Sequence, residues 1–327
     1  MFDETIKLEI MKKILFILAI LASANAIAQQ NAQYQQYIFN ELVINPAYAG
    51  TKEFTNMSAI YSNQWAGLEG SPSTQTLALD GAFSNRVGLG FHLLNDKIGA
   101  QSQQAFFFSY AYRIPITEKL KLSLGIAAGA SFFTLDGTKL LTDDGVVDPA
   151  IPTATEYQAR FDSKTGLFLY SDRFYTGFSV SDLLSDVIRS KDLLIAKQAR
   201  HYYLTSGYIF DLSPKFKFKP SFLFKEDFEA PSVIDINSFF LYNERVWLGA
   251  TARFGAKIFS SENLDNTLRL RNGYSFMIEY YITDRFRAGY AYTHSLTVLK
   301  SYPGHEIALG LYFPNKVGTK MKSPRYF

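Results

Sequence analysis

The stretch K-L-K-L-S-L-G-I-A-A-G-A-S-F at residues 119–132 decides the fold of this chain. Every even position in it is apolar, whereas the odd positions hold lysine, serine, glycine and alanine. Successive side chains of a β-strand point to opposite faces, so this period of two predicts a long strand with one apolar face. The small residues on the second face indicate a crowded interior, because a face in contact with water is usually richer in threonine, lysine and glutamate.

The same alternation recurs along the chain, at residues 105–114, 215–224, 274–280 and 307–313. It is built from an unusual stock of aromatic residues, 29 Phe and 21 Tyr in 327 residues, while charged residues make up only 19%. The mean hydropathy is nevertheless −0.04. The absence of cysteine excludes a disulfide-stabilised domain and a cysteine-ligated metal site, and a net charge of +3 is too small to indicate nucleic acid.

We therefore predict an all-β protein, a transmembrane antiparallel up-and-down β-barrel. No segment after the N-terminal region approaches the 18 or more apolar residues that a membrane-spanning helix needs. A soluble β-sandwich also alternates, but its polar face is solvated, whereas here that face is often Gly, Ala and Ser. Tyr and Phe near the ends of the predicted strands are typical of the aromatic girdles at two membrane interfaces.

About fourteen strands are expected, an even number as in bacterial single-chain barrels. Short connections, such as residue 172, alternate with longer ones, such as 137–160 and 181–199. Short periplasmic turns and long extracellular loops produce that rhythm, which places both termini in the periplasm of a Gram-negative bacterium. The predicted strands are 54–62, 73–83, 86–95, 101–114, 119–136, 161–171, 173–180, 200–211, 215–226, 232–242, 245–256, 271–282, 285–295 and 303–313.

The N-terminal region predicts export. Lys12 and Lys13 precede an apolar run at residues 14–21, and Ala26-Ile27-Ala28 ends a stretch of small residues, which together are the parts of a secretory signal peptide. Met11 is expected to be the natural start. The predicted organisation is a signal peptide at 1–28, with 1–10 upstream of that start, a periplasmic segment at 29–53, the barrel at 54–314 and a periplasmic tail at 315–327.

Basic residues of the predicted inward face gather near the short turns, so the lumen should be electropositive at its periplasmic mouth. They are Arg86, Arg113, Lys119, Lys121, Arg173, Lys215, Lys217, Lys219, Arg245, Arg285 and Arg287. Two accounts are open. The side chains simply extend from the periplasmic turns into water, or they form a collar for an acidic partner segment or a plug.

Two stretches are not explained by the alternating pattern that any outer-membrane barrel would show. Residues 33–40, Q-Y-Q-Q-Y-I-F-N with Tyr37 at their centre, lead into Asn45-Pro46-Ala47-Tyr48-Ala49-Gly50 before the first strand. Gln64 and Trp65 open the glycine-containing first loop at 63–72. A rigid aromatic among glycines suits a binding anchor or a loop folded inward as a lid, and we name Tyr37, Asn45, Pro46, Tyr48, Gln64 and Trp65 as candidate partner-binding residues.

These stretches resemble the PorP/SprF family of outer-membrane proteins from the type IX secretion and gliding motility apparatus of Bacteroidetes. The matching residues are 37–40, 45–50, Gln64-Trp65 with Gly67, Gly70 and Pro72, 96–99, and the tail 323–327. Glu41 and Val43 depart slightly from the expected pattern. The resemblance implies a non-enzymatic barrel of the outer membrane, without catalytic residues or cofactors. Its implied partners are a periplasmic ring lipoprotein complex or one secreted adhesin or enzyme with a C-terminal sorting domain.

Three functions are weighed. The first is a barrel that docks or anchors a type IX substrate through external loops containing Trp65, 137–160 and 181–199. The second is a passive channel or transporter of hydrophobic solutes. The third is an outer-membrane hydrolase, disfavoured because the four histidines (His92, His201, His294 and His305) accompany no recognisable catalytic or metal-binding motif.

If the basic residues form a collar, replacing Lys215, Lys217 and Lys219 together with Gln should weaken capture of an acidic partner. The loss should be largest at low salt, because added ions screen the attraction in the parent protein as well. Capture measured as a function of ionic strength tests the collar, and capture that is unchanged by the triple substitution rejects it.

Overall fold

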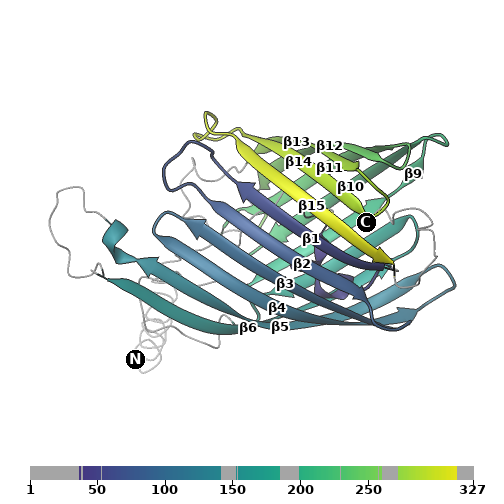
Figure 1. Cartoon of the computed structure of the whole chain (residues 1–327), viewed down its shortest axis with the longest axis horizontal. Helices are drawn as coiled ribbons and strands as arrows, with labels where there is room; N and C mark the ends of the chain where they lie inside the picture. The colour runs from purple at the N-terminus through teal and green to yellow at the C-terminus, as the bar shows by residue number, and fades with distance from the viewer. Residues whose placement is uncertain are drawn as a thin grey trace, which may run out of the picture.

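The computed structural model describes residues 37, 40–52, 54–140, 152, 154–184, 199–228, 230–256, 258–259 and 272–314. These residues form a closed β-barrel of tilted strands (Figure 1). The predicted signal peptide, the C-terminal tail and much of the predicted loops at 137–160 and 181–199 lie outside the described residues. In the part of the chain that is described, no helix is long and apolar enough to cross a membrane.

The elements follow one another as a simple meander of strands with short 3₁₀ turns. The strands are β1 (Phe54–Asn63), β2 (Ser73–Ala82), β3 (Val87–Ile98), β4 (Gln101–Pro115), β5 (Lys121–Asp136), β6 (Thr155–Tyr170), β7 (Phe174–Ser181), β8 (His201–Tyr208), β9 (Phe210–Asp211), β10 (Phe216–Glu226), β11 (Ser232–Tyr242), β12 (Val246–Ala256), β13 (Gly273–Tyr281), β14 (Phe286–Ser295) and β15 (Gly304–Pro314). The 3₁₀ turns are η2 (Glu41–Val43), η3 (Pro46–Tyr48) and η4 (Gly137–Lys139).

Except for β8 and β9, every strand pairs antiparallel with its neighbours in sequence, and β1 pairs with β15 to close the ring. The short β9 continues β8 after an interruption at Ile209, and both pair with β10. With β8 and β9 counted as one, the barrel wall has fourteen strands, here called staves. This confirms the predicted fold class and strand count. We call the end with the connections 83–86, 116–120, 171–173, 212–215, 243–245 and 282–285 the turn end, and the opposite end the loop end.

Alternating burial along the strands separates an outer apolar face from an inner face. Phe276 and Ile278 on β13 point outward and are 57% and 46% exposed, whereas Ser275 and Met277 between them are buried. On β5, the odd positions of the stretch quoted above point inward as predicted, with Ser123 and Ala127 buried. Since alternation on every stave puts the apolar side chains outside, the surrounding phase of this barrel is lipid.

Two strands extend further than the sequence pattern predicts. β3 continues to Ile98, so its connection to β4 is only Gly99 and Ala100, and Gly99 makes the tight reversal with a φ of +55°. β6 begins at Thr155, where 161 was expected, because it pairs with the full length of β5. In both cases the backbone ladder runs on through polar residues, and the apolar periodicity that predicts strands ends before the strand does.

A charge on the outer face should destabilise the barrel strongly. Ile278→Arg places a guanidinium in the middle of β13 against lipid, and a cost of roughly 2–4 kcal/mol is expected for such a substitution near the bilayer midplane. Urea-dependent refolding into phosphatidylcholine vesicles measures it. Glu118→Arg, in the tight connection between β4 and β5, is the matched control and should leave the midpoint unchanged; equal midpoints for both variants would contradict a lipid-facing position for Ile278.

Candidate functional site: a plugged lumen and a loop rim

Residues 40–52, here called the plug segment, turn back on themselves through η2 and η3 before β1 begins. The sequence makes this fold locally. The Asn45 side chain accepts a hydrogen bond from the Ala47 amide at 2.9 Å and caps η3, and Pro46 occupies the first position of that turn, where no donor is needed. Gly50 then adopts a φ of +68°, which a side chain would strain.

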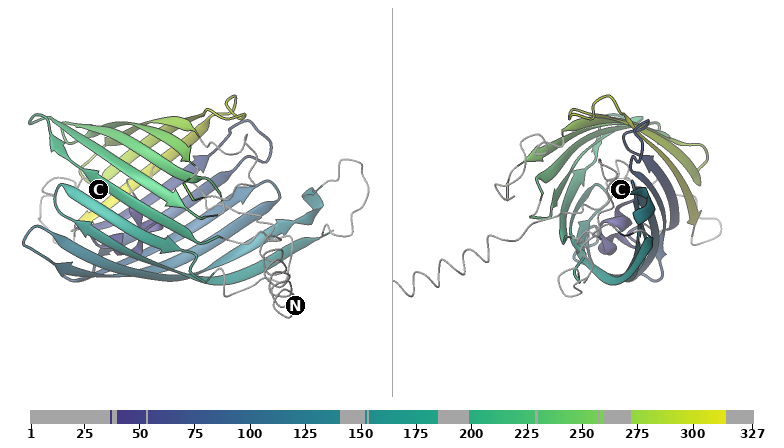
Figure 2. Two further views of the ribbon diagram at one scale, coloured as in Figure 1. Left: turned by 180° about the vertical axis from the view of Figure 1, so that it is seen from behind. Right: turned by 90° about the vertical axis from the view of Figure 1, so that its left-hand side faces the viewer.

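The plug segment lies inside the barrel, near the turn end. Figure 2 (right) looks into the barrel from one end and shows this purple segment within the ring of strands. Ala47, Tyr48 and Ala49 are completely buried, and Leu42 is 1% exposed. Part of the predicted periplasmic segment at 29–53 is thus enclosed by the barrel wall, and the lumen at this level is filled by protein.

A row of glycines on the inner wall forms the seat of the plug segment. A Cβ atom on Gly88 of β3 would overlap the Ala49 carbonyl oxygen, and one on Gly125 of β5 would overlap the Ala47 amide. The small residues that the sequence places on the inner face therefore admit the backbone of the plug segment at contact distance. Gly166 of β6 similarly leaves room for the side chain of Asn45.

The wall also holds the plug segment by hydrogen bonds to its backbone. Lys164 of β6 donates to the Val43 carbonyl at 3.0 Å, and Ser179 of β7 donates to the Ile44 carbonyl at 2.7 Å. At the other end of the segment, the Gly50 amide donates to Asp80 at 3.1 Å, and Arg113 donates to the Gly50 carbonyl. Because these bonds come from β2, β4, β6 and β7, the plug segment bridges a large part of the ring.

Three acidic and three basic side chains interact around the plug segment, and none is more than 4% exposed. They are Glu41, Lys52, Asp80, Lys219, Glu279 and Arg287. Arg287 of β14 and Glu279 of β13 form an ion pair of 2.6 Å. Lys52 lies 5.6 Å from the ring centre of Tyr48 and 5.7 Å from that of Tyr312. Buried charges are tolerated only when they compensate one another, so the interior is a matched set rather than a cationic surface.

Burial changes the acidity of the two titratable groups that the plug segment contributes to this set. It raises the pKa of Glu41 to about 7, against the opposing attraction of the Lys219 ammonium. Burial, reinforced by Arg287, lowers the pKa of Lys52 to about 8. Both shifts favour the neutral forms relative to water, because the ionised forms lose their hydration on entering the barrel.

The structure separates the candidate residues into two groups at opposite ends of the barrel. Asn45, Pro46 and Tyr48 lie in the plug segment, and Tyr48 packs edge-on against Phe168 with ring centres 5.5 Å apart. Tyr37 is also inside, where its hydroxyl accepts a hydrogen bond from Asn237 at 3.0 Å. None of these four side chains forms part of an outer surface.

Gln64 and Trp65 lie at the loop end, directly after β1. Trp65 has a φ of +54° and is partly exposed. Its loop is tied to two others, because the Ala66 amide donates to the Pro303 carbonyl at 2.7 Å and the Gly99 amide donates to the Gly70 carbonyl at 2.9 Å. We call residues 64–72, 99–100 and 296–303 the loop rim. The structure does not bring Trp65 and the plug segment together.

The basic residues named from the sequence divide by depth. Arg113, Lys219 and Arg287 are buried and serve the plug segment and its charge set. Lys119, Lys215 and Arg285 are exposed at the turn end, and Lys121 is half-buried there. Lys217, also half-buried, pairs with Asp211 at 2.9 Å and with Glu244 at 3.2 Å.

Sequence reasoning missed the acidic half of the interior. Asp80 and Glu279 occupy inward positions of alternating strands, so the same count that located the basic residues would have located them. It also missed a loop-end cluster, in which the His201 ring lies 3.5 Å from Asp182 and 3.6 Å from Asp227 and links the connections after β7 and β10. Within the described ranges, no group of three or more His, Asp or Glu is arranged to hold a metal ion.

Residues 26–311 match the model of the family described as type IX secretion system membrane protein PorP/SprF. This match spans the plug segment, its glycine seat and nearly every strand. The chain belongs to the PorP/SprF family. The resemblance seen in the sequence is thereby confirmed, and this PorP/SprF barrel is an outer-membrane protein. No curated protein matches the sequence.

Several solved barrels are similar to the PorP/SprF chain in shape. The CymD monoaromatic hydrocarbon channel is 11% identical with a TM-score of 0.47, covering 86% of this chain and 92% of its own. A FadL homologue of Pseudomonas aeruginosa is 9% identical with a TM-score of 0.46, covering 85% and 93%. Omp33 of Acinetobacter baumannii is 8% identical with a TM-score of 0.45, covering 80% and 98%.

The glycine seat of the PorP/SprF barrel can be tested with a single thiol, because the chain contains no cysteine. Leu42→Cys places that thiol in the plug segment at a buried position. Gly125→Ala should then speed its labelling by a membrane-impermeant maleimide by about tenfold to a hundredfold, since overpacking costs roughly 1–3 kcal/mol.

The matched control is Gly304→Ala on β15, where the nearest atom to a new Cβ is 3.2 Å away and belongs to a side chain. It should leave the labelling rate of the thiol unchanged. Equal rates in the two glycine variants would show that the wall does not determine how the plug segment is seated.

Proposed function

We propose that this chain is a non-enzymatic, closed barrel of the type IX secretion system that docks a secreted substrate at its loop rim. The observation that carries the proposal is the filled lumen: the plug segment is buried, hydrogen-bonded to four staves and enclosed by a compensated charge set. A conduit needs a free lumen, whereas a docking protein needs a rigid platform. Asp80, Arg113, Lys164 and Ser179 use their polar groups to hold the plug segment backbone.

The loop rim is the proposed docking surface, with a C-terminal sorting domain of the substrate as its partner. Trp65 is partly exposed, and its loop is fixed by hydrogen bonds to Pro303 and Pro72. A fixed aromatic loses little conformational entropy when it is covered, which is why such residues often dominate binding energy. The side chains of the plug segment would contribute indirectly, by keeping the barrel closed and rigid.

The turn end is proposed to face the periplasm and the loop end the cell exterior, because bacterial barrels place their short turns on the periplasmic side. On this orientation β1 begins and β15 ends on the periplasmic side, and both termini are proposed to lie in the periplasm. The exposed cations at the turn end, Lys119, Lys215 and Arg285, would then face the periplasmic ring lipoprotein complex.

Co-purification tests the docking role. A tagged barrel isolated from its own outer membrane should carry one secreted protein in near-stoichiometric amount, and Trp65→Ala should reduce that amount by at least about tenfold, the loss typical of a dominant interface residue. Leu248→Ala, on the lipid-facing side of β12, is the control and should retain the substrate. An unaltered yield with Trp65→Ala would remove the loop rim from the proposal.

Conductance in a planar bilayer distinguishes a docking protein from a channel. The parent barrel should show no stepwise current, because the plug segment fills the lumen at the turn end. Reproducible open steps from the parent protein, with no co-purified substrate, would favour the passive channel instead.

A further inference from the structure

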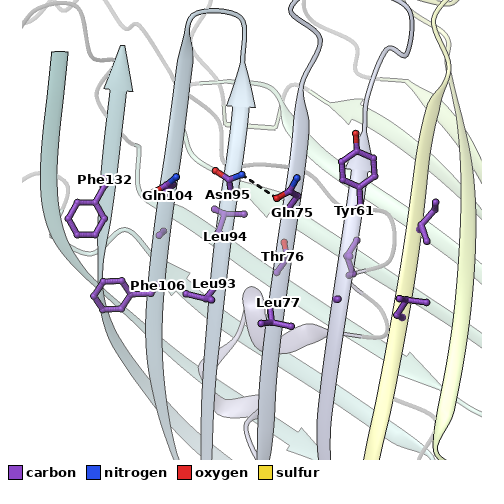
Figure 3. Close-up of a pocket in the computed structure, with 15 residues that line it drawn as sticks. Tyr61, Gln75, Thr76, Leu77, Leu93, Leu94, Asn95, Gln104, Phe106 and Phe132 are labelled. Carbon is purple, nitrogen blue, oxygen red and sulfur yellow. Dashed lines mark hydrogen bonds between the residues drawn. The ribbon is translucent and has the colours of Figure 1, made fainter. Parts of the chain in front are cut away.

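A hollow of about 730 Å³ lies on the outer surface of the barrel, over β1 to β4. Figure 3 views it from outside, with the loop end at the top and the plug segment behind the wall. Phe106 and Phe132 border one side, and Ile307 and Leu309 of β15 border the other. The floor includes the small side chain of Ala59, so the outer wall is recessed between two apolar ridges.

Three amide side chains cross the hollow in one row. Gln75 of β2 pairs in register with Asn95 of β3, which pairs in turn with Gln104 of β4. The Asn95 amide donates to Gln75 at 3.3 Å, as the dashed line in Figure 3 shows. The row continues on either side into aromatic residues, Tyr61 opposite Gln75 and Phe132 opposite Gln104.

This row marks a gap in the loop-side aromatic girdle. At comparable outward positions near the loop end, β8, β13 and β14 carry Tyr202, Tyr274 and Tyr292. Girdle residues lie where hydrocarbon meets the polar part of the membrane. Gln75, Asn95 and Gln104 lie within four residues of the loop end of their strands. We expect the carbonyl and hydroxyl groups that link acyl chains to a lipid headgroup at this level.

Within the part of the chain that the structure describes, the three amides have fewer hydrogen-bond partners than they can use. Each primary amide has two donor hydrogens and an acceptor oxygen with two lone pairs, so the Asn95–Gln75 bond satisfies only a small part of the capacity of the three side chains. An amide that faces lipid without a hydrogen-bond partner costs free energy. Below the row, toward the turn end, the surface is apolar and includes Leu77 and Leu93.

We propose that this hollow binds one membrane lipid in a defined orientation. An acyl chain lies over Ala59, Leu77 and Leu93, and the carbonyl-bearing or hydroxyl-bearing linkage of the lipid bonds to the amide row. The occupant is a lipid because the hollow opens onto the lipid-facing side, and because its polar groups are neutral hydrogen-bonding amides at the girdle rather than charged groups. This site is separate from the plug segment and from the loop rim.

Native mass spectrometry of the full-length barrel, released from detergent with added dioleoyl-phosphatidylethanolamine, measures the binding. The parent protein should retain one lipid more tightly than any further ones. Ala59→Phe fills the floor and should reduce that occupancy about tenfold. Gln75→Leu with Gln104→Leu should reduce it by a similar factor, since two hydrogen bonds are lost while the apolar contacts remain.

Two outward substitutions outside the hollow are the controls. Ala250→Phe on β12 matches the change in size and Ser238→Leu on β11 matches the change in polarity, and both should retain the lipid. The heat-dependent mobility of folded barrels on gels shows that each variant has folded. Equal lipid retention by the parent, hollow and control variants, or no retained lipid in the parent, overturns the proposal.

Photo-crosslinking in the intact outer membrane identifies the occupant independently of detergent. Benzoylphenylalanine in place of Leu93 should give an adduct with the mass increase of one lipid. An adduct of protein size would overturn the proposal and assign the hollow to a partner protein.

Discussion

The contact on which the interior depends is the approach of the plug segment backbone to the glycines of the barrel wall. Strands β3 and β5 each lack a side chain where that backbone touches them, and β6 lacks one where the Asn45 side chain lies. No residue other than glycine leaves the same space. Removing side chains from a strand weakens it, because glycine lowers β-propensity and has nothing to pack. The barrel accepts this loss at Gly88, Gly125 and Gly166, and the plug segment supplies the missing packing from inside.

Charge compensation follows from the same enclosure. Once the plug segment excludes water, every ionised side chain that remains inside must find an opposite charge or lose its own. Arg287 with Glu279 is the clearest case, a 2.6 Å pair between two neighbouring staves. Lys219 and Glu41 interact across the gap between wall and plug segment. The plug segment is therefore held by electrostatic interactions that its own presence strengthens.

The barrel was predictable from the sequence because a two-residue period is a local property, legible in any stretch such as 119–132. The location of the segment before β1 was not, since nothing local distinguishes a periplasmic stretch from one enclosed by the barrel. The Asn45-Pro46 motif is distinctive in the sequence, but its structural role depends on β6. Gly166 leaves space for the Asn45 side chain, and the Leu167 carbonyl accepts a hydrogen bond from it. The alternation also predicts that Arg113, Lys219 and Arg287 face inward, but it predicts a cationic mouth. Their partners come from elsewhere in the chain: Glu279 of β13 for Arg287, Glu41 of the plug segment for Lys219, and backbone carbonyl groups for Arg113.

The plug segment is joined to the barrel at the seam between β1 and β15, where the ring of strands closes. β1 and β15 are paired along ten positions, and the Phe54 and Tyr312 rings meet at 4.7 Å beside Lys52, the last described residue before β1. Separation of β1 from β15 would therefore disturb the Phe54–Tyr312 contact and the position of Lys52 at the base of the plug segment together.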